Sequence, residues 1–207
     1  MTTTRGRLVV FEGLDQSGKQ TQTAMLKAAL EASGLQVETY DFPDYATPIG
    51  REIGEALRGA RAFPPDALQL LYVANRCEHR PVMERALGEG RWVICDRFLA
   101  SSVAYGEAQG LDPVWLLDIQ RVLPVPDLTL LLDLAPDVAA ARKLAERDRF
   151  EQDLDLLHRV RASYLQQARS AGWATLDASR HRDEVARDVR DVTSRRLGVS
   201  GVGHPRE

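Results

Sequence analysis

Short runs of apolar and β-branched residues alternate along the chain with longer stretches in which apolar residues recur every three or four positions. The short runs are typical of strands buried on both faces, and the longer stretches are typical of amphipathic helices. The predicted strands are RLVVFEG (7–13), LQVETYDF (35–42), RWVICD (91–96), LTLLLDL (128–134) and WATLDAS (173–179). The predicted helices cover 19–33, 48–59, 65–90, 101–121, 136–172 with an interruption, and 183–197.

This alternation predicts an α/β fold with a doubly wound, five-stranded parallel sheet between layers of helices. Ligands of such sheets bind beyond the carboxyl ends of the strands. The residues that leave the strands at that edge are Gly13, Phe42 with Pro43, Asp96 with Arg97, and Asp177–Ser179. We expect all four exits to meet in one crevice.

A length of 207 residues suits a single domain, expected at residues 1–197, followed by a flexible, glycine-rich tail at 198–207. The net charge of −3 argues against a nucleic-acid-binding protein, because such proteins usually carry a basic surface. No apolar run is long enough to span a membrane, so no membrane partner is expected. Cys77 and Cys95 lack metal-ligand spacing, which favours two reduced thiols in a cytoplasmic protein.

The stretch GLDQSGKQT (13–21) follows the first predicted strand and opens the first predicted helix. It has the G-x-x-x-x-G-K spacing of a P-loop, whose backbone N–H groups surround a phosphate while the lysine reaches the outer phosphates. A glycine-rich turn with a chance lysine is the alternative, but strand, loop and helix all agree with a nucleotide site. The expected nucleotide-binding residues are Gly13, Leu14, Asp15, Gln16, Ser17, Gly18, Lys19, Gln20 and Thr21. The fold is therefore expected to be a three-layer α/β fold of the P-loop NTPase type.

One position of the loop departs from the usual pattern, because Gln20 stands where Ser or Thr normally follows the lysine. The usual hydroxyl ligates Mg²⁺ directly. A carboxamide oxygen is also a hard ligand and could substitute; alternatively, water and Asp96 hold the ion without it. Gln20 and Asp96 are thus the candidate magnesium ligands.

A second set of residues suits another nucleotide. Gln69, Tyr72 and Arg76 fall at i, i+3 and i+7, on one face of a predicted helix. An aromatic ring and a guanidinium one turn apart can stack on a base and hydrogen-bond its edge. The alternative is a core-facing Tyr72 and a solvated Arg76, since such pairs are common on helices.

Charged residues also appear where the buried sheet is expected to meet the crevice. Asp96 ends an otherwise apolar strand and Arg97 follows directly. The carboxylate can hold magnesium or a sugar hydroxyl, and the arginine can bind a phosphate through two hydrogen bonds; a solvated ion pair is the alternative. Asp15, inside the loop, suits either a sugar hydroxyl or an ordinary turn.

Taken together and in order, these motifs resemble the thymidylate kinase family from about Leu8 to Val192. The matching stretches are FEGLDQSGKQT, DFPDYATPIG, LYVANRCEHRP, DRFLASSVAY, LPVPDLTLLLDL, RDRFEQ and LDAS. The resemblance implies ATP with Mg²⁺ as phosphate donor on residues 13–21, and dTMP as acceptor. The implied acceptor contacts are Asp15 to the sugar 3′-hydroxyl, Phe42 and Tyr72 to the thymine faces, Arg76 to its polar edge, Arg97 to the phosphate, and Ser102 and Tyr105 to base and deoxyribose.

The resemblance is also imperfect at Gln16, where some family members carry a catalytic arginine. Members without it draw that charge from a mobile lid, and ARKLAERDRFEQ is expected to form such a lid at about residues 142–152. An ordinary charged helix surface is the alternative. The implied catalytic residues are Lys19, Asp15, Asp96, Arg97, Arg142 and Arg149.

The expected reaction is the transfer of the γ-phosphate of ATP to dTMP, a step in dTTP biosynthesis. Another nucleoside or nucleotide kinase is one alternative, and a nucleotide-binding module impaired at Gln20 is a second. The resemblance further implies a homodimer, for which the apolar stretch PVWLLDIQRVL (113–123) could supply the interface.

Overall fold

The computed structural model describes residues 5–142, 150 and 153–199. Two sequence predictions lie largely outside these described residues. They are the lid, of which only Arg142 and Phe150 are described, and the glycine-rich tail, of which only Gly198 and Val199 are described. Within the described part, β1 (Leu8–Glu12), β2 (Val37–Asp41), β3 (Trp92–Asp96), β4 (Leu128–Asp133) and β5 (Ala174–Asp177) form one sheet. The strand order is β2-β3-β1-β4-β5 and every pairing is parallel, as predicted.

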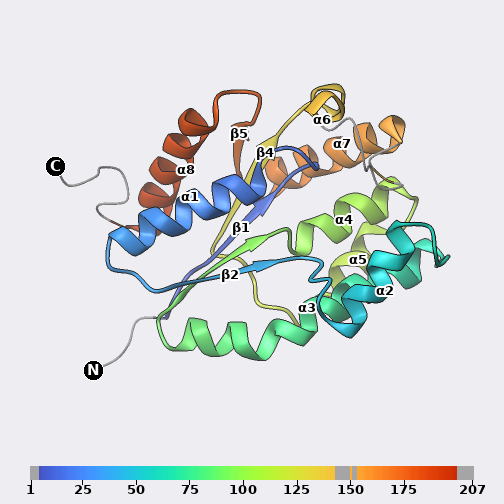
Figure 1. Ribbon diagram of the computed structural model, residues 1–207, viewed down its shortest axis with the longest axis horizontal. Coiled ribbons are helices and arrows are strands. Elements are labelled where there is room, and N and C mark those ends of the chain that lie inside the picture. The colour runs from blue at the N-terminus through green and yellow to red at the C-terminus, as the bar shows by residue number, and fades with distance from the viewer. Residues whose placement is uncertain (1–4, 143–149, 151–152, 200–207) are drawn as a thin grey trace.

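Helices cover both faces of this sheet (Figure 1). The first face carries α1 (Lys19–Ala32) and α8 (Arg182–Leu197), and their core includes Val9 and Phe11 of the central strand. The second face carries α3 (Pro65–Gly88), α4 (Leu99–Ala108) and α7 (Leu154–Ala171). Leu8 and Val10 point to this face because successive side chains of a strand alternate. The three-layer, doubly wound α/β fold of the P-loop NTPase type is confirmed.

Three shorter helices lie around the carboxyl ends of the strands: α2 (Pro48–Leu57), α5 (Pro113–Asp118) and α6 (Pro136–Arg142) (Figure 1). The α2 helix begins at Thr47, whose hydroxyl accepts a hydrogen bond from Gly50 N, and it has proline at its first position. No described helix is long and apolar enough to cross a membrane.

The single helix predicted over 101–121 is wrong, because the chain forms two helices there. Gly110 adopts a left-handed backbone conformation with φ 88° and ends α4. Asp112 then accepts a hydrogen bond from Val114 N, and Pro113 takes the first position of α5. The sequence GLDP therefore contained the stop and start signals of both helices.

The prediction that all strands are buried on both faces is wrong for the two edge strands. β2 contains partly buried and exposed residues only, and β5 alternates between buried and exposed residues. β2 and β5 are edge strands, each with a neighbouring strand on one side only. Polar residues such as Glu38 are common on edge strands, because they discourage pairing with another chain. The three inner strands are buried throughout except at Asp96 and Asp133, their terminal residues.

Gly50 tests how tightly the loop after β2 packs on α2. A Cβ at Gly50 would lie 1.7 Å from the Asp44 carbonyl oxygen, so Gly50→Ala must displace backbone. We expect the free energy of unfolding to fall by about 1–3 kcal/mol, which is measured as a lower melting temperature. Gly88→Ala is the matched control, since nothing lies within 4 Å of that position in α3. Equal melting temperatures for the two variants would contradict this packing.

Candidate active site

The phosphate loop leaves β1 and leads directly into α1. Gly13 and Gly18 have φ values of 141° and 89°, which L side chains rarely adopt. A Cβ at Gly13 would also lie 2.5 Å from the Leu132 carbonyl oxygen of β4. The two glycines thus allow a tight turn that ends at the amino terminus of α1, where N–H groups and the helix dipole favour an anion.

Lys19 lies at the start of α1 and is 6% exposed. Its Nζ donates to the Leu14 carbonyl oxygen at 3.0 Å and stands 3.9 Å from Asp96 Oδ1. Burial lowers the pKa of the Lys19 ammonium, and the charge of Arg97 lowers it further, against the opposing pull of Asp96. A phosphate beside Lys19 would supply the anion that favours its charged form.

Two carboxylates, Asp41 and Asp96, end neighbouring strands, and Asp96 is the one that lies near Lys19. Asp41 of β2 is the register partner of Asp96 of β3. Burial raises the pKa of Asp41, and the negative charges of Asp96 and Asp44 raise it further. Such mutual repulsion is relieved by a cation, and carboxylate oxygens are the ligands that Mg²⁺ prefers.

Gln20, the other candidate magnesium ligand, lies in a different setting. Its side chain is exposed and, with Thr21, lines a hollow shared with Arg182 and Asp183 at the start of α8. The hydroxyl of Ser17, earlier in the loop, is buried without a hydrogen-bond partner among the described residues. Across the described part of the chain, no three His, Cys, Asp or Glu side chains gather as a metal site.

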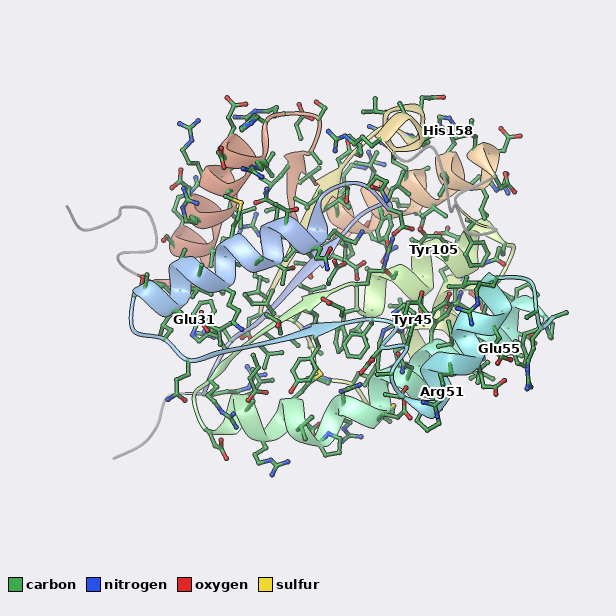
Figure 2. The ribbon with its side chains drawn as sticks, in the orientation of Figure 1. Glu31, Tyr45, Arg51, Glu55, Tyr105 and His158 are labelled. Carbon is green, nitrogen blue, oxygen red and sulfur yellow. The ribbon has the colours of Figure 1, made fainter. Side chains whose placement is uncertain are left out.

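A pocket with about 520 Å³ of empty space, part of it open to solvent, lies next to the phosphate loop. Its lining contains every residue predicted from the sequence for the acceptor: Asp15, Phe42, Tyr72, Arg76, Arg97, Ser102 and Tyr105. The lining also contains Gln69, which the sequence placed on the face of Tyr72 and Arg76, and Pro43, which follows Phe42 at the exit of β2. The sequence did not single out the remaining lining residues: Tyr45, Leu57, Ser101 and Phe150. Tyr45 and Tyr105, which both line the pocket, lie right of centre in Figure 2, away from Glu31 at the far end of α1.

Arg76 is a buried, charged residue in the lining of this pocket. It is only 2% exposed, and its Nη1 donates to Ser102 Oγ at 2.8 Å and to Gln120 Oε1 at 3.1 Å. Burial lowers its pKa to about 10, so the guanidinium stays charged at neutral pH. The alternative of a solvated Arg76 is therefore wrong.

Aromatic side chains form the walls. Phe42 is held by Phe98 and His79, with ring centroids 5.8 Å and 5.6 Å away, and Tyr72 lies on the α3 face that also carries Arg76. The ring of Phe150 lies 5.6 Å from that of Tyr105. A pocket with aromatic walls and one buried guanidinium is suited to bind a flat ring that has polar groups on its edge.

Arg97 stands between the pocket and the phosphate loop. Its Nη1 donates to the Gly13 carbonyl oxygen at 3.0 Å, and its Nη2 donates to Asp15 Oδ1 at 2.8 Å. Burial alone would lower its pKa, but Asp15 above all, and then Tyr105, Tyr164 and Asp96, hold the pKa well above its usual value. The residue has a φ of 64°, a conformation that is strained for a non-glycine residue.

A buried carboxylate that the sequence analysis overlooked holds Arg97 in this position. Glu12, the last residue of β1, accepts hydrogen bonds from Phe98 N at 2.9 Å, Ser101 Oγ at 2.7 Å and Tyr164 OH at 3.2 Å. The hydroxyls of Ser101 and Tyr164 also accept from Arg97 Nη1, at 3.3 Å and 3.1 Å. A charge at the end of an apolar strand was a usable signal for Glu12, as it was for Asp96.

Arg142 lies at the far side of the phosphate loop. Its Nη1 donates to the Gln16 carbonyl oxygen at 3.0 Å, and its Nη2 donates to the Ala178 carbonyl oxygen at 3.0 Å. The exit of β5 therefore contacts the loop side of the site, whereas the exits of β2 and β3 line the acceptor pocket. The β5 exit, one of the four expected to meet in one crevice, is thus absent from the lining of the acceptor pocket and meets the site only beside the phosphate loop. The predicted Arg149 lies outside the described residues.

Comparison with known proteins agrees with this geometry. Residues 11–189 match the family model described as Thymidylate kinase. A thymidylate kinase of Danio rerio is 35% identical over 202 residues, which are 97% of this chain and 95% of that protein. A probable thymidylate kinase of Pyrobaculum calidifontis is 39% identical over 194 residues, covering 91% and 96%. A solved structure of thymidylate kinase from Candida albicans superposes with a TM-score of 0.79 at 29% identity, covering 93% of each chain.

Tyr164→Phe tests the network under Arg97. The change removes one donor from the buried Glu12 carboxylate and one acceptor from Arg97. We expect a loss of about 1–3 kcal/mol in the free energy of unfolding, measured by urea titration. Tyr40→Phe is the control, because its hydroxyl donates to the partly exposed Glu38 on the edge strand. A Tyr164 variant as stable as the control would show that the network contributes nothing.

Proposed function

Because this chain belongs to the thymidylate kinase family, we propose that its site transfers the γ-phosphate of ATP to dTMP. As an ATP-dependent nucleoside monophosphate kinase it is a transferase. The observation that carries the proposal is the position of Arg97. One guanidinium lines the acceptor pocket and also hydrogen-bonds the phosphate loop, so it stands where two phosphates would meet.

The acceptor would occupy the pocket with its base between Phe42 and Tyr72. Arg76 and Ser102 would contact the polar edge of thymine. Asp15 would accept a hydrogen bond from the sugar 3′-hydroxyl, and the ring of Tyr105 would crowd the place of a 2′-hydroxyl. This favours a deoxyribose over a ribose.

The donor would lie along residues 13–21, with Lys19 at its outer phosphates. The nucleophile is an oxygen of the dTMP phosphate, which is already anionic at neutral pH, so no general base is needed. It forms a bond to the γ-phosphorus while the bond to the β,γ-bridging oxygen breaks and ADP leaves. The barrier comes from bringing two anions together, so catalysis rests on charge neutralisation and alignment by Lys19 and Arg97.

Magnesium would be held by Asp96, and the facing Asp41 carboxylate fits the same ion. The ion would neutralise phosphate charge when bound. Mg²⁺ commonly uses one or two carboxylates and completes its shell with water and phosphate oxygens. Gln20 is exposed at the start of α1 and would reach the ion only through water or a turned side chain.

A lid at about residues 142–152 would exclude water and bring Arg142 and Arg149 to the transferred phosphate. The described part that supports it is Arg142, which already contacts the phosphate loop, and Phe150, which lines the acceptor pocket. We place this lid within a single domain that spans residues 1–197. Closure of such a lid protects ATP from hydrolysis.

A homodimer in a cytoplasmic setting is also part of the proposal. Val114 and Leu117 of α5 are 62% and 55% exposed, which leaves an apolar surface for a second copy. The two free thiols, Cys77 and Cys95, suit a reducing compartment. Sedimentation of the protein would give its oligomeric state.

The two rival functions make different demands on the same residues. A kinase for unphosphorylated nucleosides has no use for Arg97 in the acceptor pocket, and an impaired module has no use for a buried Lys19 beside Asp96. The retained charges therefore favour a monophosphate kinase.

A coupled ADP-release assay with a panel of nucleoside monophosphates tests the substrate. We expect dTMP to be preferred, and Arg97→Ala to lower kcat/KM for dTMP by about 10²–10³-fold while ATP binding persists. Arg80→Ala is the control, because Arg80 is exposed on α3 and pairs with Glu84. Unchanged turnover in Arg97→Ala would refute the acceptor assignment.

Gln20→Ser restores the usual hydroxyl of the phosphate loop. We expect the variant to remain active and to reach half-maximal rate at a different Mg²⁺ concentration, because a direct ligand would be added. Rates are measured across a magnesium titration at fixed ATP. Complete inactivation would instead give Gln20 an essential role in the loop.

A further inference from the structure

Gln69 has an unusual environment. It lies on α3, is 0% exposed, and lines the acceptor pocket. Neither its Oε1 nor its Nε2 has a hydrogen-bond partner among the described residues. A buried carboxamide with both groups unpaired is costly, and native proteins rarely keep one without a reason.

The other buried amide of the same helix shows that α3 can satisfy such a group. Asn75 Oδ1 accepts from Asp44 N at 2.8 Å, and its Nδ2 donates to Thr47 Oγ1 at 2.8 Å and to Glu78 Oε2 at 3.0 Å. Asn75 anchors the loop before α2, and it lies outside the pocket lining. Gln69 differs because it lines the pocket and its amide has no partner among the described residues, so a ligand in the pocket is the candidate partner.

Tyr72 lies between Gln69 and Arg76 along one face of α3. Positions i, i+3 and i+7 share one face, so a base that stacks on the Tyr72 ring has Gln69 about one turn away on one side and Arg76 about one turn away on the other. Arg76 Nε is also buried and unpaired among the described residues. Both ends of the pocket thus present an unused donor.

A pyrimidine such as thymine has two ring carbonyls, one on each side of its ring N–H. We propose that Gln69 hydrogen-bonds the ring carbonyl that Arg76 leaves free, and so acts as a second specificity-determining residue for the acceptor base. This rests on the proposed function. The base is then held through both carbonyls, with the Gln69 carboxamide donating through Nε2.

Gln69→Met tests the contact, because methionine is close to glutamine in size and has no amide. The free protein should gain stability, since an unpaired buried amide is removed; we expect a melting temperature higher by about 2–4 °C. The dissociation constant for dTMP should rise about tenfold, equivalent to about 1.4 kcal/mol, and that for ATP should not change. A merely structural role would lower the melting temperature.

Titration with 2-thio-dTMP and 4-thio-dTMP identifies the bond, since sulfur accepts hydrogen bonds more weakly than oxygen. In the native protein each analogue should bind more weakly than dTMP. In Gln69→Met the penalty of one analogue should vanish and that of the other should persist. Gln167→Met is the control: its amide donates to Ala100 O and Ser163 Oγ outside the acceptor pocket, so both penalties should persist.

Unchanged dTMP affinity in Gln69→Met, or persistence of both penalties, would overturn the Gln69 contact while leaving the kinase intact. A native protein that neither binds nor phosphorylates dTMP would overturn the proposed function itself, and the contact with it.

Discussion

The site depends on one buried carboxylate at the end of the central strand. Glu12 accepts hydrogen bonds from the start of α4, through Phe98 N and Ser101 Oγ, and from α7, through Tyr164 OH. Without these donors the carboxylate would be a fully buried polar group with no hydrogen-bond partner, which is costly. The hydroxyls of Ser101 and Tyr164 also accept hydrogen bonds from the guanidinium of Arg97 and so help to position it. Glu12 thus joins α4 and α7, two helices that are distant in the chain, to the end of β1 at the active site.

The balance of charge follows from that arrangement. Lys19 is buried, Arg97 is largely buried, and the charge of Arg97 lowers the pKa of Lys19, whereas Asp96 and Asp15 oppose this repulsion. Two cations that lie close together are stabilised by anions between them, and in the proposed reaction two nucleotide phosphates would supply these. The apolar walls of the acceptor pocket strengthen the effect, because charges interact more strongly where water is excluded.

Much of this arrangement could be predicted from the sequence, since its signals are local. Strand and helix periodicity predicted the parallel sheet, and the spacing of glycines and Lys19 predicted the phosphate loop. The division between α4 and α5 was signalled at Gly110 and Pro113 but was missed. The hydrogen bond from Tyr164 to Glu12 joins residues that are 152 positions apart, so no local sequence pattern indicates it. Gln69 was noticed on its helix face, but only the fold shows that its amide is unpaired.

The central claim is that one cleft holds two anionic nucleotides end to end, with Arg97 at their junction. Calorimetric titration of dTMP into the protein saturated with a non-hydrolysable ATP analogue and Mg²⁺ tests this most directly. The account predicts one dTMP bound per chain, with the analogue still in place. Displacement of the analogue by dTMP, or the absence of any dTMP binding in its presence, would contradict it.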